Sequence, residues 1–328
     1  LCLALRSLIL DEVSEDVYKD LLGLPEVVSE VRRRLSFHPV DRRAAYERVA
    51  GVDAGSQRVP LASRWFAVVT ALVYQLPEAR RYFTGPESVK LPYSLSGERF
   101  QEVVGLRREA KLFETAAGFL ANRGGVDLLL VDGPLAFGNW WANKGEDRDR
   151  AALVSSINLL LDLCAEEGVA VAGVVKRATA RYLIDYLGLR EATQLPDAFI
   201  LLQTMRPGER TGVFSPGEAL RRTVRAAPFM DRISHPIHSF YMRSSPNGLA
   251  PPIRVDVPEY MLSRVDELAG HCYATAVRDG VPLALVRADE EARVTKRFVD
   301  GVYSELIPRL ESRLGAPSLA AAVWGELS

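Results

Sequence analysis

The chain has 328 residues, of which 48% are hydrophobic and 25% are charged. That length and composition suffice for a large buried core, and they argue against a wholly disordered chain. The formal net charge is −1, from 41 Lys and Arg against 42 Asp and Glu. Because this balance neither proposes nor excludes a nucleic-acid partner, an argument for one has to come from local clusters of charge.

The cysteines and the apolar start of the chain bear on its compartment. Cys2, Cys164 and Cys272 are far apart and form no CxxC pair, which argues against a disulfide framework or a cysteine zinc site and favours a cytoplasmic protein. The opening run LCLALRSLIL is too short to span a bilayer, so we expect no membrane segment. We interpret residues 1–45 as an N-terminal helical docking segment, with a core helix as the alternative for the opening run.

The first elements predicted beyond that opening run are helix and then strands. Residues 12–50 are rich in charge and predict helix, with a turn at His38-Pro39. Three β-rich runs joined by short links follow, at 46–56, 65–74 and 81–94. Consecutive strands with short links are typical of an antiparallel meander.

The pattern then changes to alternating helices and strands. A long helix is predicted over 97–125, because apolar residues recur at helical spacing from Val103 to Leu120 and two glycines end the run. The next predicted elements are a buried strand at 126–134, a helix at 147–167, a buried strand at 169–177 and a short helix at 178–188. This order predicts an α/β fold with an RNase H-like mixed sheet, an antiparallel meander plus parallel strands, flanked by helices.

The remainder of the chain is less regular. Strands are predicted at 197–205, 237–244 and 252–258, and helices at 259–279 and 290–311. Since no linker is long enough to force a boundary, we expect one domain over 46–311 and a C-terminal tail over 312–328.

Two aspartates stand at the ends of predicted strands. Asp53 ends the first strand, in GVDAGS, and Asp132 ends the fourth, in LLLVDGP. In a sheet of this order the first strand lies beside the fourth, so the two carboxylates can meet. Paired carboxylate oxygens suit Mg²⁺ or Mn²⁺, and two such ions about 4 Å apart can hold the attacking water and the leaving oxygen of a phosphodiester. The alternative is that each aspartate only makes a turn.

A third carboxylate is expected from the long predicted helix. Glu109 and Glu114 flank its apolar stripe on opposite sides, so helical periodicity does not choose between them. At least one of the two is expected to be an ordinary solvated glutamate.

The order of the short motifs resembles the NurA family. They are GVDAGS, LFETAA, LLLVDGPL, GVVKR, IHSFYMRSSP, PIRVDVP and GVPLALVRADEEARVTKR. The likeness covers most of the chain from about residue 46 onward. It implies a Mn²⁺-dependent (alternatively Mg²⁺-dependent), homodimeric DNA nuclease of RNase H-like fold that works with the hexameric translocase HerA. It further implies 5′-to-3′ exonuclease and single-strand endonuclease activity in the resection of DNA double-strand ends.

The resemblance also assigns site residues by position. It places the family's metal ligands on Asp53, Glu114 and Asp132. Lys176, at the end of a predicted strand, is then a candidate to contact phosphate or orient water, and its alternative is an ordinary strand-end cation. Tyr241 falls where the family has an aromatic residue near the site, although a tyrosine in an alternating strand is more often part of a core.

One expected ligand differs from the family pattern. Where the resemblance implies a histidine, this chain has Asp289, which follows the apolar run GVPLALVRA. We expect Asp289 either to ligate metal from a strand end or to cap the following helix. His271 is near in sequence and is the other candidate for the missing histidine.

Two segments are candidates for contact with DNA. Residues 205–232 have a local excess of arginine that suits a phosphate backbone, and its alternative is a solvated loop. The candidate arginines are Arg206, Arg210, Arg221, Arg222 and Arg225. Trp140 and Trp141 follow Asp132 and cannot both face one side, so one of them is a candidate to stack on an unpaired base. A packing or dimer contact is the alternative for the tryptophans.

Missing motifs narrow the function further. The sequence contains no P-loop, no GxGxxG after a strand, no HExxH and no GxSxG. Metal-dependent DNA cleavage is therefore the leading hypothesis. The alternatives are another RNase H-like repair endonuclease or RNase, and a non-catalytic or weakly active DNA-binding partner of a translocase.

Overall fold

The structure, a computed structural model, describes residues 2–59, 61, 64–123 and 125–314. The chain divides into two compact units, each built from segments far apart in sequence. We call Tyr46–Gly173, Pro228–Pro236 and Leu283–Ser328 the meander unit, and Leu1–Ala45, Val174–Ala227 and Ile237–Pro282 the N-terminal unit. The predicted C-terminal tail lies outside the described residues from 315 onward.

The meander unit is organised around a mixed sheet. Its strands are β2 (Val49–Arg58), β3 (Arg64–Leu76), β4 (Arg80–Pro92), β5 (Leu128–Asp132) and β6 (Ala170–Val175), the last of which continues into the N-terminal unit. β2, β3 and β4 form the predicted antiparallel meander, and β5 pairs with β2 in parallel. The order β6-β5-β2-β3-β4 confirms that the first predicted strand lies beside the fourth.

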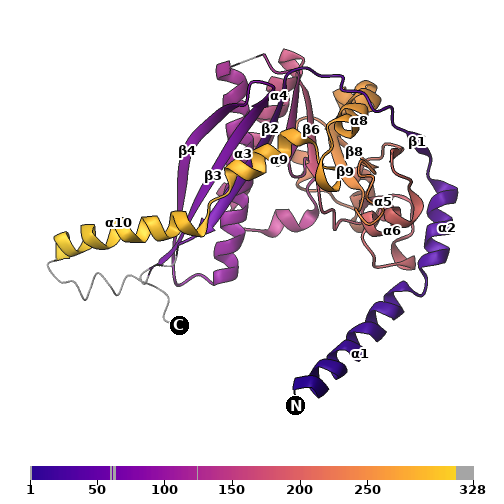
Figure 1. Cartoon of the computed structure of the whole chain (residues 1–328), viewed down its shortest axis with the longest axis horizontal. Coiled ribbons are helices and arrows are strands. Elements are labelled where there is room, and N and C mark those ends of the chain that lie inside the picture. Colours follow the sequence, from indigo (N-terminus) through magenta and orange to yellow (C-terminus); the bar gives the residue numbers. More distant parts are fainter. Residues whose placement is uncertain (1, 60, 62–63, 124, 315–328) are drawn as a thin grey trace. The chain divides into compact units, whose positions relative to one another are not determined.

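Helices cover both faces of this sheet (Figure 1). On one face, α3 (Gly97–Arg123) packs its Phe100 against Ala67 of β3, and α4 (Asp147–Glu167) packs on α3. On the other face, α9 (Leu283–Ala292) packs its Ala288 against Leu72 of β3. Residues 67 and 72 point to opposite faces because side chains alternate along a strand. A mixed sheet between helices is the RNase H-like class that the sequence predicts.

Three further helical segments of the meander unit are described. The helix α10 (Lys296–Leu314) follows α9, and its Val299 is buried with Val59 and Val68. Short 3₁₀ helices lie at Asn139–Asn143 (η1) and Met230–Arg232 (η3).

The N-terminal unit has its own antiparallel strands. They are β1 (Phe37–Pro39), β7 (Glu209–Thr211), β8 (Ile237–Met242) and β9 (Ile253–Pro258), paired in that order. Its helices are α1 (Cys2–Leu21), α2 (Leu24–Arg34), α5 (Tyr182–Tyr186), α6 (Asp197–Thr204), α7 (Pro216–Val224) and α8 (Val265–Ala274), with 3₁₀ turns at Arg190–Ala192, Glu259–Arg264 and Arg278–Gly280. Among the described residues, no helix is both long and apolar enough to cross a membrane.

Several predicted elements are wrong, and short apolar runs explain two of them. The run at 197–205, predicted as a strand, is the helix α6, and the run before Asp289 is the helix α9. A short apolar run can be buried as a strand or as a helix, so hydrophobic periodicity does not distinguish the two. His38-Pro39 is part of β1 instead of a turn, and residues 40–48 contain no helix.

Candidate metal centre

Three aspartates of the meander unit converge on one point. Asp53, Asp132 and Asp289 each offer a carboxylate oxygen, and these oxygens all lie within 4.8 Å of one another. All three residues are partly buried. They come from β2, β5 and α9, which are three segments far apart in sequence.

The pairing of β2 with β5 brings the first two aspartates together. The two strands run parallel, and their last paired residues are Val52 and Val131. Asp53 and Asp132 are the next residues on their strands, so their carboxylates leave the sheet side by side. The backbone N–H of Ala54 donates to Asp53 Oδ1 at 2.7 Å, which helps to fix that carboxylate.

Two glycines bring the third aspartate close. A Cβ added to Gly51 would lie 2.3 Å from the carbonyl oxygen of Ala284, and one added to Gly55 would lie 2.3 Å from that of Ala292. Gly51 and Gly55 share a face of β2 with Asp53, since side chains alternate along a strand. The helix α9 therefore rests directly on the face that carries Asp53, at a distance that only glycine permits.

Asp289 reaches the cluster from within α9. It stands between Leu283 and Ala292, the ends of that helix, so it neither ends a strand nor caps a helix. Both placements predicted from the sequence are wrong, because the apolar run before Asp289 is the buried side of a helix. Arg293, one turn further on, donates to Asp289 Oδ2 at 2.6 Å.

A fourth carboxylate, that of Glu109, lies next to this cluster. Glu109 is 7% exposed, and its Oε2 lies 3.7 Å from the position that a Cβ on Gly133 would occupy. Gly133 directly follows Asp132 and has a φ of +146°, a conformation that favours glycine. Glu109 therefore approaches the end of β5 from α3.

Glu114, by contrast, is exposed on α3. Its charged neighbours are Lys111, Glu87 and Arg107, none of which belongs to the aspartate cluster. Helical periodicity left Glu109 and Glu114 equivalent, and the resemblance favoured Glu114. The burial of Glu109 beside Gly133 favours Glu109 as the carboxylate that α3 contributes.

Arg108 of α3 is a cation beside this group of acids. Its Nη2 donates to Glu109 Oε1 at 2.6 Å. Burial lowers the pKa of Arg108, but the negative charges of Glu109, Asp53 and Asp132 outweigh burial and hold that pKa above its usual value. Arg108 is not predicted from the sequence, because one arginine in the charged run LRREAK carries no distinguishing signal.

Three other candidates lie in the N-terminal unit. Tyr241 is fully buried, and its hydroxyl donates to Asp197 Oδ2 at 2.9 Å, so we do not include it in the catalytic set. His271 is buried in α8, where burial lowers its pKa. Lys176 directly follows β6 and is partly buried, and its role stays a prediction.

The candidate arginines differ in exposure. Arg210 is 8% exposed and bonds to Asp266 at 2.7 Å, so it serves a structural ion pair. Four others are exposed, namely Arg206, Arg221, Arg222 and Arg225. Arg222 also lies 4.6 Å from the ring centre of Tyr186. The α7 region therefore presents arginines to solvent, as a surface for phosphate requires.

The tryptophans follow Asp132 on η1. Trp141 is partly exposed, with its ring 5.0 Å from that of Phe137 and 5.6 Å from Lys144 Nζ. The side chain of Trp140 lies outside the described part of the chain. Trp141 thus combines a packing contact with some exposure, and both predicted uses of it stay open.

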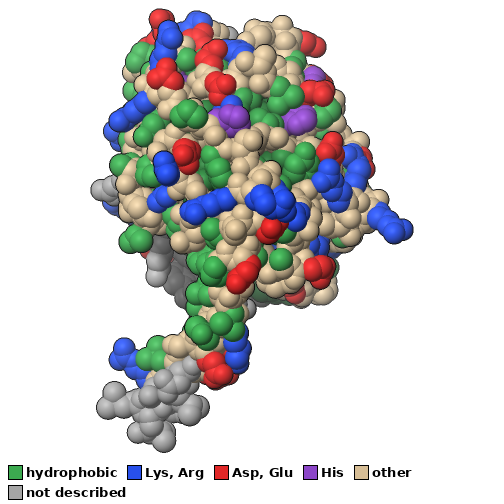
Figure 2. Space-filling view, turned by 90° about the vertical axis from the view of Figure 1, so that its right-hand side faces the viewer, with side chains coloured by type: hydrophobic (Ala, Val, Ile, Leu, Met, Phe, Trp, Pro, Cys, Tyr) green, Lys and Arg blue, Asp and Glu red, His purple; other side chains and the backbone are tan. Residues whose placement is uncertain are grey.

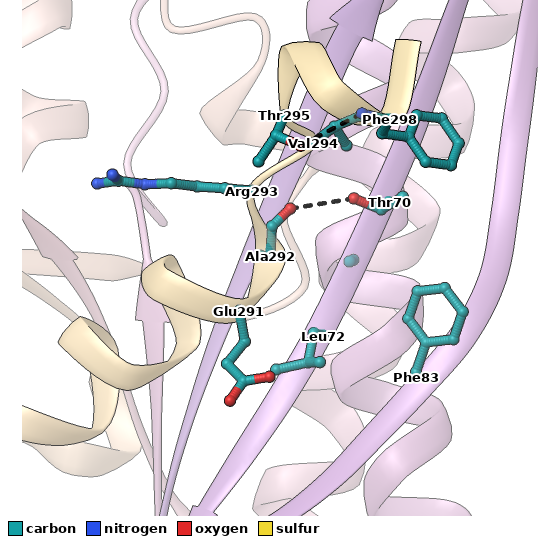
Figure 3. A pocket seen from close by; sticks show the side chains of 10 residues that line it. Thr70, Leu72, Phe83, Glu291, Ala292, Arg293, Val294, Thr295 and Phe298 are labelled. Carbon is teal, nitrogen blue, oxygen red and sulfur yellow. Dashed lines mark hydrogen bonds between the residues drawn. The ribbon is translucent and has the colours of Figure 1, made fainter. Parts of the chain in front are cut away.

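A pocket of about 160 Å³ lies where α9 meets α10 (Figure 3). Phe83 and Phe298 line it, and the hydroxyl of Thr70 donates to the carbonyl of Ala292 at 3.2 Å. None of the three aspartates lines this pocket. It is mainly apolar and holds no cluster of carboxylates, so it is not the candidate metal centre.

The acidic cluster suits a hard divalent cation. Mg²⁺ and Mn²⁺ prefer carboxylate oxygen, and this cluster offers carboxylates from strands and a helix of one compact unit. Its members come from rigid elements, which keeps the oxygens together without an ion. The residues present therefore fit a divalent metal, which Asp53, Asp132 and Asp289 would hold. Glu109 lies beside them.

Known proteins of similar fold include several nucleases. The NurA nuclease from Sulfolobus solfataricus matches with a TM-score of 0.66 at 17% identity, over 93% of this chain and 96% of that one. A NurA structure with manganese gives 0.58 at 11% identity, over 92% and 98%. A NurA structure bound to dAMP and manganese gives 0.52 at 11% identity, over 96% and 98%.

These structural likenesses, at low identity, establish the fold. No curated protein matches the chain in sequence. A model of the NurA domain, however, matches residues 47–294, which is more than half of the chain. The match includes Asp53, Glu109, Asp132 and Asp289. This chain belongs to the NurA family.

Proposed function

We propose that this chain is a DNA nuclease that hydrolyses phosphodiester bonds with Mn²⁺, or alternatively Mg²⁺. The observation that carries the proposal is the cluster of Asp53, Asp132 and Asp289, within 4.8 Å, in a member of the NurA family. The solved relatives support the choice of ion and substrate, since one NurA was determined with manganese and another with dAMP and manganese.

The chain's own residues provide a fixed set of oxygen ligands. Asp53 would hold the ions from within β2, Asp132 from the end of the adjacent β5 and Asp289 from α9, and Glu109 would complete the set from α3. Ions bound there supply positive charge that stabilises the phosphate as water replaces the leaving sugar oxygen. The rigid sheet and its two covering helices keep the carboxylates in place, so little rearrangement is needed when substrate arrives.

The finer activity follows the family. We assign the chain 5′-to-3′ exonuclease and single-strand endonuclease activity, in resection of DNA double-strand ends. It acts as a homodimer with a HerA-type translocase. Membership of the NurA family supports these assignments.

We place the DNA-binding surface on the arginines of the α7 region. Arg206, Arg221, Arg222 and Arg225 are exposed, which supports contacts to a phosphate backbone. Trp141, which follows Asp132 on η1, stacks on an unpaired base, and Lys176 contacts a phosphate. We leave Arg210 out of this surface, because its side chain is buried and bonds to Asp266.

The test is hydrolysis of labelled DNA by the purified full chain. Linear strands labelled at the 5′ or the 3′ end, and circular single strands, are incubated with Mn²⁺, Mg²⁺ or EDTA. We expect cleavage with Mn²⁺ and none with EDTA. Early loss of the 5′ label identifies 5′-to-3′ polarity, and cutting of the circle identifies endonuclease activity. DNA binding without cleavage under every condition would instead support the non-catalytic translocase partner.

A further inference from the structure

Arg108 occupies an unusual place for a helix arginine. It donates to Glu109 Oε1 at 2.6 Å, and its side chain is 42% exposed while that of Glu109 is 9% exposed. The guanidinium of Arg108 therefore bonds to a buried carboxylate of the candidate centre and is itself partly exposed to solvent. A substrate that reaches the metal ions arrives from solvent, and the Arg108 side chain is partly open to solvent.

Its neighbour on α3 shows what a purely structural arginine looks like. Arg107 donates to Asp149 Oδ1 at 2.5 Å, and the side chain of Asp149 is 0% exposed. Arg107 also reaches Glu87 Oε1 at 3.2 Å. This arginine is held by two acids outside the candidate centre, whereas Arg108 bonds to Glu109, which lies beside the aspartate cluster.

The charges around Arg108 depend on whether metal is bound. Without ions, the carboxylates of Glu109, Asp53 and Asp132 all attract its guanidinium. Divalent ions on the same carboxylates neutralise them and compete with the arginine. Ion binding therefore weakens the attraction between these carboxylates and the Arg108 side chain, which is already partly exposed to water.

A guanidinium released in this way suits a phosphate. It is planar and always charged, and its donors match two phosphate oxygens at once. On the basis of the proposed nuclease function, we propose that Arg108 balances the acidic cluster in the metal-free protein and contacts the scissile phosphate of DNA once ions are bound. The same side chain thus opposes metal binding and assists hydrolysis.

Arg293 is the competing candidate for this role. It bonds to Asp289 at 2.6 Å, but the contact is an exposed pair one helical turn apart, with 69% of the arginine side chain in water. Figure 3 shows Arg293 extending away from the pocket that adjoins it. Largely exposed ion pairs of this kind contribute little free energy, so Arg293 is the weaker candidate for the role proposed for Arg108.

The test compares Arg108→Gln, Arg108→Lys and wild type, with Arg48→Gln as the matched control. Arg48 is a similarly exposed arginine, 48%, whose carboxylate partner is Asp127, away from the cluster. Mn²⁺ affinity is measured by calorimetric titration without DNA, and hydrolysis is measured at saturating Mn²⁺. We expect Arg108→Gln to bind Mn²⁺ several-fold more tightly and to lower kcat about 100-fold, the usual effect of losing one donor to a developing charge. Arg108→Lys is expected to recover part of that rate.

The two measurements separate this inference from the proposed function. A wild type that binds Mn²⁺ but cuts no DNA would overturn the proposed function. Weaker Mn²⁺ binding together with slower hydrolysis in Arg108→Gln would show that the arginine only holds the carboxylates in place. An unchanged rate at saturating Mn²⁺ would show that it does not touch the phosphate. Either result for Arg108→Gln would overturn the role proposed for Arg108.

Discussion

The positions of the two carboxylates distinguish Glu109 from Glu114 on α3. Glu109 is buried beside Gly133, while Glu114 is exposed. We expect Glu109→Gln to lower hydrolysis with Mn²⁺ at least about tenfold, the lower range for loss of a group that orients a metal site. Glu114→Gln is the matched control and should retain the wild-type rate. A loss confined to Glu114→Gln would restore the assignment that the family resemblance implies.

At Asp289 the prediction concerns metal affinity as well as activity. Asp289→Ala should weaken Mn²⁺ binding and hydrolysis, because one of the three clustered oxygens is lost. Asp289→His should retain more activity than alanine, since histidine can ligate and is the residue implied for the family at this position. Glu290→Ala, which removes the exposed neighbour on α9, is the control. Equal Mn²⁺ affinity in Asp289→Ala and wild type would remove Asp289 from the site.

The sequence predicts the two aspartates of the sheet but not their partners, and its placement of Asp53 at a strand end is wrong, because β2 continues past Asp53 to Arg58. Asp53 and Asp132 end predicted strands that the meander order makes neighbours, and the structure pairs those strands. The choice of Glu109 depends on how α3 packs, which periodicity along the helix does not record. Arg108 gave no signal because charged residues are common on helices.

The spacing Gly-x-Asp-x-Gly in β2 determines how close α9 can come. A Cβ on Gly51 or Gly55 would meet a backbone carbonyl of α9 at 2.3 Å, and backbone cannot turn aside as a side chain can. We expect Gly51→Ala and Gly55→Ala each to lower the free energy of unfolding by about 1–3 kcal/mol, the range for overpacking a core. Both should also lower activity, because α9 carries Asp289.

Gly85 provides the control for this pair. It lies in β4, and a Cβ added there meets nothing within 4 Å. Gly85→Ala should therefore change the melting temperature little and leave hydrolysis at the wild-type rate. If Gly51→Ala and Gly85→Ala melt alike, then α9 is not seated on β2 in the way described.

At the scale of elements, the regular part of the fold was predictable and the ambiguous apolar runs were not. The helix at 97–125 and the strand at 126–134 correspond to α3 and β5, because long periodic or continuous apolar patterns have one interpretation. The runs that became α6 and α9 are short enough to bury as strand or helix. In α9, Ala284, Leu285, Ala288 and Ala292 are buried at helical spacing, a pattern visible once small residues are counted as core.

For the whole molecule, the exposed side of α1 is the proposed docking surface for a translocase. Leu10, Val13 and Val17 lie at helical spacing on α1 and are 54%, 53% and 50% exposed. Figure 2 shows hydrophobic side chains among charged ones on α1, whose N-terminal end is marked in Figure 1. A helix with a solvent-exposed apolar stripe suits a partner's groove.

This docking role predicts a separation of binding from cleavage. Leu10→Glu with Val17→Glu should weaken binding to a HerA-type hexamer at least about tenfold, on the scale of losing well-buried anchors. Cleavage of single-stranded DNA without the partner should stay at the wild-type rate. Glu12→Lys with Lys19→Glu alters the opposite side of α1 and should bind normally. Partner affinity that is the same for both double variants would place the docking surface elsewhere.

The central claim is that the clustered aspartates hold the ions for DNA hydrolysis. Its most direct measurement is the rate of DNA hydrolysis with Mn²⁺ for wild type, Asp53→Asn and Asp132→Asn, with circular dichroism to check that each variant is folded. Losing an ionised ligand should lower the rate by orders of magnitude in both variants, since each tenfold corresponds to about 1.4 kcal/mol of transition-state stabilisation. A folded variant that keeps more than about a tenth of the wild-type rate has lost less than about 1.4 kcal/mol of transition-state stabilisation. That result would contradict the assignment of the clustered aspartates as metal ligands.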